Sequence, residues 1–510
     1  MVLLPSMRLH PNATITPGDL AAGKRALVRD AAWASMAGSL YGGVILVGFA
    51  LALGANSFVI GVLSALPLIA QAFQLPAIAL VEWLQRRKTI AVLAVTTARI
   101  LILGLALLPF LGESSARLAF LVVTQFAITF FGAVTGCALN SWLHQLLPRE
   151  GLGEFFSRRL FWATVVSCSG TLVAGVVVDH APLEDLQGYS IVFAAAGLAG
   201  FVSSWYLAQV PEPRMVRAGP AESMFTKIRA PFTDRAFRRL LVFMGSWNIA
   251  SNIAAPFVSV YLMKQLGYPL STVTTLWVAS QIANALTLYA WGRVSDRMSN
   301  KAILAVALPA YFTAMLALIF TDLTDKDVLI LPWLYLIHVV MGAAGGGISL
   351  ATGNLGLKLA PQGRGTTYLS AIGIVNSIAG GIASILGGAL AQWFTSSQLS
   401  LVIRWASISR YAELAVIEIA RWQFLFAISF VLGFYVLHAL SRIDEGEEFS
   451  ERLVVQQFGL EALRTVNQLS SIAGLLGNFI SFGRLSERRL FWRTPRNDDA
   501  VARQQRKESA

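Results

Sequence analysis

The stretch LLPREGLGEFFS at residues 146–157 recurs 213 positions later as LAPQGRGTTYLS at residues 359–370. The same shift aligns further landmarks along the chain without a gap. It pairs identical residues in both parts of the sequence: Gly54 with Gly267, Lys88 with Lys301, Pro148 with Pro361, and Gly175 with Gly388. A register that holds over such a distance indicates an internal repeat. The chain is therefore predicted to consist of two similar halves.

Both halves are strongly apolar. Hydrophobic residues make up 55% of the chain and charged residues only 13%, with a mean hydropathy of +0.62. This composition is typical of a membrane protein, in which a span needs about 20 apolar residues. Twelve stretches meet that requirement, six in each half: 30–53, 57–84, 89–111, 117–146, 158–179, 189–210, 239–263, 270–291, 302–320, 329–357, 366–394 and 422–440.

The net charge of +12 comes from loops on one side of these spans. Cytoplasmic loops of membrane proteins are enriched in Lys and Arg, so this bias predicts that both termini are cytoplasmic and argues against nucleic-acid binding. Lys88 and Lys301 then lie on the same side, which requires an even number of crossings between them. The two halves are therefore expected to be parallel repeats.

The charged segments divide the chain into five predicted parts. A cytoplasmic segment at 1–29 precedes a six-helix bundle at 30–210, and a Pro-rich, basic cytoplasmic linker at 211–238 leads to a second bundle at 239–440. The cytoplasmic tail at 441–510 is charged and then shows apolar residues at helical spacing, which predicts an amphipathic helix. The long outer segment at 395–421 is expected to lie at the membrane surface.

The sequence GRVSDRMSNK at 292–301, after the eighth span, resembles the loop signature of the major facilitator superfamily. Gly292, Asp296, Arg297 and Lys301 occupy signature positions. The first half has VEWLQRRK at 81–88 instead, with Glu82 one position before the expected aspartate. The resemblance covers about 24–440 and implies an all-α membrane fold of twelve helices in two bundles, acting as a secondary transporter with alternating access.

Such a loop is expected to form a cytoplasmic latch, because a carboxylate held near a helix terminus and an arginine makes contacts that exist only while that side is closed. By the logic of the repeat, Asp296 would meet the region around Arg364, and Glu82 the region around Arg158 and Arg159. The alternative is that these charges merely anchor helices in the headgroup layer.

The resemblance also implies a central cavity lined by the first, second, fourth and fifth spans of each half. Amides and hydroxyls are costly in hydrocarbon unless they are paired, so they contact each other, water or a ligand. For each residue alone, pairing between helices is the simpler interpretation. As a set they predict a polar substrate cavity: Trp33, Tyr41, Gln71, Gln125, Asn140, Asn248, Asn252, Gln281, Asn284, Asn354 and Asn376.

Three ionisable residues are candidates for ion coupling or for contact with an anion. Asp30 stands at the predicted start of the first span, where capping of a helix N-terminus is the leading interpretation. Arg99 lies near the middle of the third span, with no carboxylate expected at its depth, so either an anionic substrate or a structural contact is its partner. His144 shares a helix face with Asn140 and titrates near neutral pH when unperturbed, but an interfacial role is the simpler interpretation.

These observations predict a transporter for a small organic solute, with a solute or proton gradient as the driving force. No metal-binding Cys/His cluster and no phosphate-binding loop is found in the sequence, so neither a cofactor nor a metal is expected, and an enzyme is not predicted. The expected partners are the substrate and membrane lipid, with no obligate protein partner, in the cytoplasmic membrane of a bacterium. The alternative is a transporter-like receptor that binds a ligand or lipid without moving it.

Overall fold

The computed structural model describes most of the chain. The described residues are 15–112, 114–148, 152–180, 186–215, 224–323, 327–361, 365–407, 410–445 and 454–461. The chain divides into two compact units, residues 1–455 and residues 456–510. All labelled helices and strands belong to the first unit. The predicted boundaries of the five parts stay a prediction, and most of the predicted amphipathic tail helix lies outside the described residues.

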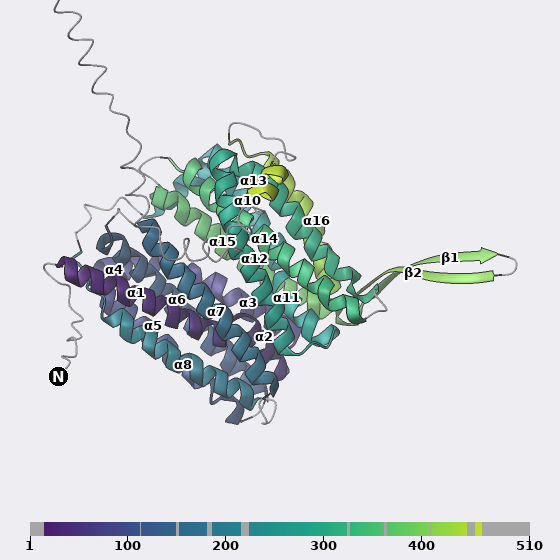
Figure 1. Cartoon of the computed structure of the whole chain (residues 1–510), viewed down its shortest axis with the longest axis horizontal. Helices are drawn as coiled ribbons and strands as arrows, with labels where there is room; N and C mark the ends of the chain where they lie inside the picture. The colour runs from purple at the N-terminus through teal and green to yellow at the C-terminus, as the bar shows by residue number, and fades with distance from the viewer. Residues whose placement is uncertain are drawn as a thin grey trace, which may run out of the picture. The chain divides into compact units, whose positions relative to one another are not determined.

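The first half is helical throughout its predicted spans (Figure 1). Its elements are α1 (Pro17–Tyr41), α2 (Gly43–Ala52), α3 (Ser57–Gln71), α4 (Gln74–Leu84), α5 (Arg87–Leu105), the short turn η1 (Leu108–Phe110), α6 (Ser114–Leu146), α7 (Leu152–His180) and α8 (Gln187–Ala208). The first predicted span is divided at Gly43, which has a φ of +54°. The second is divided between α3 and α4, which meet at a bend of 44°.

The second half repeats this order after a short connecting helix. Its elements are α9 (Met224–Thr233), α10 (Arg235–Asn252), α11 (Ala255–Val260), the π-helical turn η2 (Tyr261–Gln265), α12 (Leu270–Arg297), α13 (Asn300–Ala317), η3 (Leu318–Leu323), α14 (Asp327–Leu359), α15 (Gly365–Trp393), η4 (Phe394–Ser396) and α16 (Gln423–Ser441). Gly54 and Gly267, paired by the repeat, have φ values of +86° and +70°. Glycine adopts this left-handed conformation without strain.

The prediction of an all-α membrane fold is confirmed, with one addition. In the second half, β1 (Gln398–Ser407) and β2 (Arg410–Ala420) form an antiparallel hairpin with an irregularity between Leu401 and Val402. The hairpin occupies the segment expected at the membrane surface.

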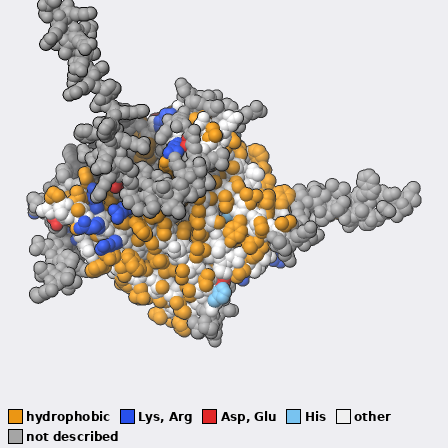
Figure 2. Space-filling model, viewed as in Figure 1, with side chains coloured by type: hydrophobic (Ala, Val, Ile, Leu, Met, Phe, Trp, Pro, Cys, Tyr) orange, Lys and Arg blue, Asp and Glu red, His pale blue; other side chains and the backbone are white. Residues whose placement is uncertain are grey.

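The chain is a multi-pass membrane protein. Ten of its described helices are long and apolar enough to cross a membrane, or eleven if the bent pair α3 and α4 is one span. Helix α12 is as long as the others but carries many hydroxyl and amide side chains, and it is not among them. The number of twelve spans and the cytoplasmic location of the termini therefore stay predictions. Figure 2 shows hydrophobic side chains over much of the helical surface, with Lys and Arg gathered toward one edge.

The two halves meet along two helix pairs, α3 with α15 and α7 with α12. Glycines allow the backbones to approach closely at both. A Cβ atom on Gly388 of α15 would lie 2.9 Å from the carbonyl oxygen of Ser57 and 3.0 Å from Cα of Gly61. One on Gly175 of α7 would lie 2.4 Å from Oγ1 of Thr274 in α12. Both contacts lie at the end of the helices that the charge bias predicts to be outside, called the outer end below.

Candidate functional site

Asp30 lies inside the first half and does not cap a helix. Helix α1 begins at Pro17, where Thr16 is the N-cap and Asp19 completes a capping box. The interpretation of Asp30 as a helix cap is therefore wrong, because the helix starts well before the apolar part of its sequence. The Asp30 side chain is 4% exposed and accepts a hydrogen bond of 2.7 Å from the Ser203 hydroxyl of α8. A buried carboxylate of this kind needs a compensating charge.

Two arginines lie within electrostatic reach of this carboxylate. The Asp30 carboxylate interacts electrostatically with Arg159 of α7 and Arg99 of α5. The side chain of Arg99 crosses α8 at Gly200, where a Cβ atom would lie 2.3 Å from the arginine Cδ. The expectation that no carboxylate lies near Arg99 is therefore wrong, because the early start of α1 moves Asp30 deeper into the bundle than the predicted span implied.

The cluster of Asp30, Arg99 and Arg159 carries an excess of one positive charge. Within the described residues, the Nε atoms of Arg99 and Arg159 are buried and have no hydrogen-bond partner. Arg159 also lines a cavity of about 380 Å³ between α1 and α7, together with Ser35, Phe156, Leu160 and three alanines. A guanidinium group exposed to such a cavity is a suitable donor for a carboxylate or phosphate.

The second half contains a pair of amides, and the positions equivalent to Asp30, Arg99 and Arg159 are the apolar Phe243, Phe312 and Ile372. The Asn248 side-chain amide of α10 donates to the Asn376 side-chain oxygen of α15 at 2.9 Å. One helical turn later in α10, the Asn252 side-chain amide donates to the backbone carbonyl oxygen of Asn248 at 2.9 Å. Gly380 packs between these amides and Leu68 of the first half. This geometry supports pairing between helices, at a place that also borders the other half.

The other predicted cavity residues are not part of the lining of the cavity between α1 and α7. Gln125 of α6 is buried and its Oε1 atom has no partner within the described residues. Gln71 is exposed and accepts a hydrogen bond from Gln74. The remainder differ in exposure: Trp33, Asn140 and His144 are exposed, and Tyr41, Gln281 and Asn284 are partly buried. Among the described residues no cluster of His, Cys, Asp or Glu could hold a metal ion. The roles of these residues in substrate binding stay predictions.

Asn354 belongs to a polar network at the end of the second half that the charge bias predicts to be cytoplasmic. Its amide donates to Oγ of Ser295 at 2.9 Å and to Oδ1 of Asn300 at 3.2 Å. The Asn300 amide in turn donates to Glu445 at 2.7 Å, and the backbone N–H of Lys301 donates to the same carboxylate at 2.6 Å. Glu445 thus caps the start of α13.

The first half has an equivalent cap. The carboxylate of Glu212, just after α8, accepts from the backbone N–H of Arg87 at 2.7 Å and lies 3.6 Å from the Arg87 Nε atom. The Arg87 guanidinium also donates to the carbonyl oxygens of Ser141 and Pro213. Sequence reasoning missed Glu212 and Glu445. Their signal was a glutamate directly after the last helix of each half.

The pKa of Glu445 reflects these contacts. Burial alone would raise the pKa of this carboxyl, but hydrogen bonds from Lys301, Asn300 and Lys358 outweigh burial and hold the pKa below its usual value. Lys358 of α14 completes the site with an ion pair of 3.2 Å. The carboxylate is therefore the stable form when the second half is folded.

The predicted cytoplasmic latch is described only in part. The side chains of Asp296 and Arg297, and all of Arg364, lie outside the described residues. Gly292 lies in the last turns of α12, and Glu82 is exposed at the end of α4. The latch therefore stays a prediction.

At the outer end, Asp179 of α7 binds the N-terminus of α12. Its two carboxylate oxygens accept from the backbone N–H groups of Leu270 and Ser271 at 3.2 and 2.6 Å. The first N–H groups of a helix have no partner within the helix, and its positive end favours an anion. Asp179 thus fastens the first half to the second.

The family model described as Major Facilitator Superfamily matches residues 31–384. Among curated protein sequences, none matches the chain. Three solved structures share its fold. The nucleoside transporter NupG has a TM-score of 0.58 and 14% identity, over 85% of this chain and 100% of that one.

The second is a bacterial homologue of the iron transporter ferroportin in its inward-facing state. It has a TM-score of 0.59 and 12% identity, over 84% of this chain and 98% of that one. The third is the inward-open xylose transporter XylE from E. coli. It has a TM-score of 0.56 and 13% identity, over 86% of this chain and 98% of that one. At these identities the likeness concerns the fold alone.

Proposed function

The chain belongs to the major facilitator superfamily and is a secondary transporter rather than an enzyme, and we propose that it carries a small organic anion together with a proton. The observation that carries this proposal is the Asp30, Arg99 and Arg159 cluster beside the cavity between α1 and α7. The cavity volume of about 380 Å³ is of the size that takes a small organic molecule.

Anion and proton are expected to bind cooperatively in this cluster. While Asp30 is ionised, it occupies the positive field of Arg99 and Arg159. A proton on Asp30 removes that counter-charge, and an anion in the cavity then replaces it beside Arg159. Each ligand thus raises the affinity for the other by the same factor, as linkage requires.

Arg99 and Arg159 have different parts in this scheme. Arg99 is held against Gly200 and maintains the local positive field. Arg159 lines the cavity and is the contact for the anion. The outer end is closed by Gly388 on Gly61 and by Asp179 on α12, so the described conformation favours exchange of the anion with the cytoplasmic side.

Uptake by the purified protein in lipid vesicles tests the proposal. Small mono- and dicarboxylates are expected to accumulate when an inward proton gradient is imposed, whereas uncharged sugars and nucleosides are not. Asp30→Asn should abolish gradient-driven accumulation and keep anion exchange across the membrane. Arg159→Gln should abolish both, and Arg229→Gln, which removes an exposed arginine of α9 outside the cavity, serves as the matched control.

Uptake of neutral solutes in preference to anions would contradict the assignment of substrate class. Anion uptake that does not depend on the pH gradient would contradict proton coupling. Binding of carboxylates without any flux would favour the alternative of a receptor that resembles a transporter.

A further inference from the structure

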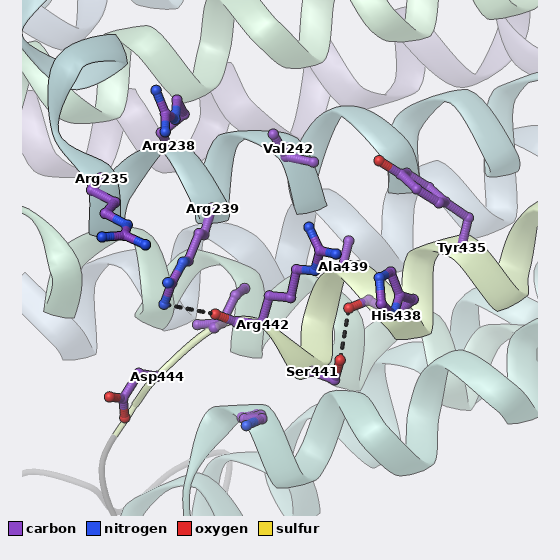
Figure 3. A pocket seen from close by; sticks show the side chains of 12 residues that line it. Arg235, Arg238, Arg239, Val242, Tyr435, His438, Ala439, Ser441, Arg442 and Asp444 are labelled. Carbon is purple, nitrogen blue, oxygen red and sulfur yellow. Dashed lines mark hydrogen bonds between the residues drawn. The ribbon is translucent and has the colours of Figure 1, made fainter.

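A basic pocket lies at the cytoplasmic end of the second half, between the start of α10 and the end of α16. Its volume is about 750 Å³. Five basic residues line it: Arg235, Arg238 and Arg239 of α10, Lys301 of α13, and Arg442 directly after α16. Figure 3 shows the arginines of α10 on one side of the pocket and Arg442 on the other.

The lining of this pocket has a large excess of positive charge. Among its described lining residues, Asp444 is the only acid, against five cations. A guanidinium N–H of Arg239 donates to the backbone carbonyl oxygen of Arg442 at 3.3 Å, which ties α10 to the end of α16 without neutralising either arginine. Like charges that line one pocket repel, so the pocket is more stable with an anion bound.

The pocket opens toward the lipid-facing surface. Val242 and Tyr435 form its apolar side and are 48% and 54% exposed. Along the same faces, Ile249 of α10 and Val431 of α16 are also exposed, as expected for side chains in contact with acyl chains. The amide of Asn248 points elsewhere, to Asn376 of α15. The basic residues thus lie where an apolar surface ends, at the depth of lipid headgroups.

We propose that this pocket binds the phosphate headgroup of an anionic membrane lipid. Arg235, Arg239 and Arg442 would hold the phosphate oxygens, since the planar guanidinium group matches phosphate geometry. The acyl chains would follow Val242 and Tyr435. Basic pockets between helices at the cytoplasmic side are a recurrent form of lipid recognition. This site lies apart from the cavity between α1 and α7 and is independent of the transported solute.

Native mass spectrometry of the full chain released from nanodiscs tests the proposal. The protein is measured from nanodiscs of phosphatidylcholine alone and from nanodiscs that also contain phosphatidylglycerol. We expect phosphatidylglycerol to stay bound to the released protein. Arg239→Gln and Arg442→Gln should each weaken phosphatidylglycerol binding about fivefold. Arg239→Lys, which keeps the charge and loses the planar fork, should weaken it less. Arg229→Gln removes an exposed cation of α9 outside the pocket and should have no effect.

Inorganic phosphate and glycerol phosphate are added to the protein in detergent to test whether a soluble phosphate binds in the absence of acyl chains. Their binding as tightly as phosphatidylglycerol would overturn the assignment to a lipid. Equal retention of phosphatidylcholine would also overturn it, as would an equal loss of binding in Arg229→Gln. Melting temperatures of all variants in detergent identify any that fail to fold, in which case Arg238→Gln at the exposed rim replaces that variant.

Discussion

The two halves of the chain agree at their edges and differ at their centres. Gly175 and Gly388, paired by the repeat, both pack against a helix of the opposite half. Glu212 and Glu445 both cap the helix that starts at the loop after the second span of their half. The first half, however, buries Asp30 within electrostatic reach of Arg99 and Arg159, whereas the second pairs Asn248 with Asn376.

This difference separates what the fold requires from what the solute requires. Close helix contacts and capped helix ends are needed by both halves, so duplication has left them alike. Under the proposed function, the centre faces the transported solute. One half then carries charge for binding and coupling, and the other carries uncharged amides that join helices and border the first half.

The largest effect is expected at the glycine contacts between the halves. Gly388→Ala should lower transport at least about tenfold, because its Cβ atom meets only backbone atoms and overpacking costs about 1–3 kcal/mol. Gly175→Ala meets the Thr274 side chain, so a second change, Thr274→Ala, should restore part of the activity. Gly136→Ala, with no atom near the new methyl group, is the control in vesicle uptake.

A second comparison concerns the two capping glutamates. Glu212→Ala should destabilise the protein by about 3 kcal/mol, because it leaves the Arg87 guanidinium buried without its counter-charge. Glu445→Ala should cost only about 1 kcal/mol, since its partner Lys358 is 55% exposed and becomes hydrated. Thermal unfolding in detergent measures both, with Glu154→Ala on the surface as reference. Equal losses would show that the caps are equivalent after all.

The pH dependence of the melting temperature should reveal how much the Glu445 carboxylate contributes to stability. Its pKa is lower in the folded protein than in the unfolded chain, so its contribution is present above the unfolded pKa and is lost as the pH falls through the folded pKa. The gap in melting temperature between the wild type and Glu445→Gln should therefore be unchanged from pH 7 down to about pH 4.5 and should narrow as the pH is lowered further. A gap that stays constant would contradict the assignment.

The smallest effect is expected in the amide cluster. Asn376→Ala removes one hydrogen bond between α10 and α15, and such bonds in membranes contribute about 0.6 kcal/mol. Transport should continue with little change, in contrast to Asp30→Asn. A loss of uptake as severe as that of Asp30→Asn, measured side by side in vesicles, would mean that both centres contact the solute.

The sequence predicted the repeat and the positions of the helices, because apolar periods and glycines leave a direct trace. Gly54 and Gly267, which the repeat pairs, both have a left-handed backbone conformation. The sequence did not predict the position of Asp30 within its helix, because residues 17–29 of α1 are helical but polar and carry no apolar signal. Glu212 and Glu445 were missed for another reason. Their function depends on contacts with residues more than a hundred positions away, which a pattern along the chain does not contain.

The seal between α3 and α15 has a consequence for turnover. Backbone rests on backbone at Gly61 and Gly388, and no long side chain spans the contact. Rigid surfaces of this kind do not stretch, so they separate as a whole once the bundles rock. We therefore expect the exposure of the binding site to the outside to be a discrete, thermally activated event with its own rate, the same for every solute that the protein carries.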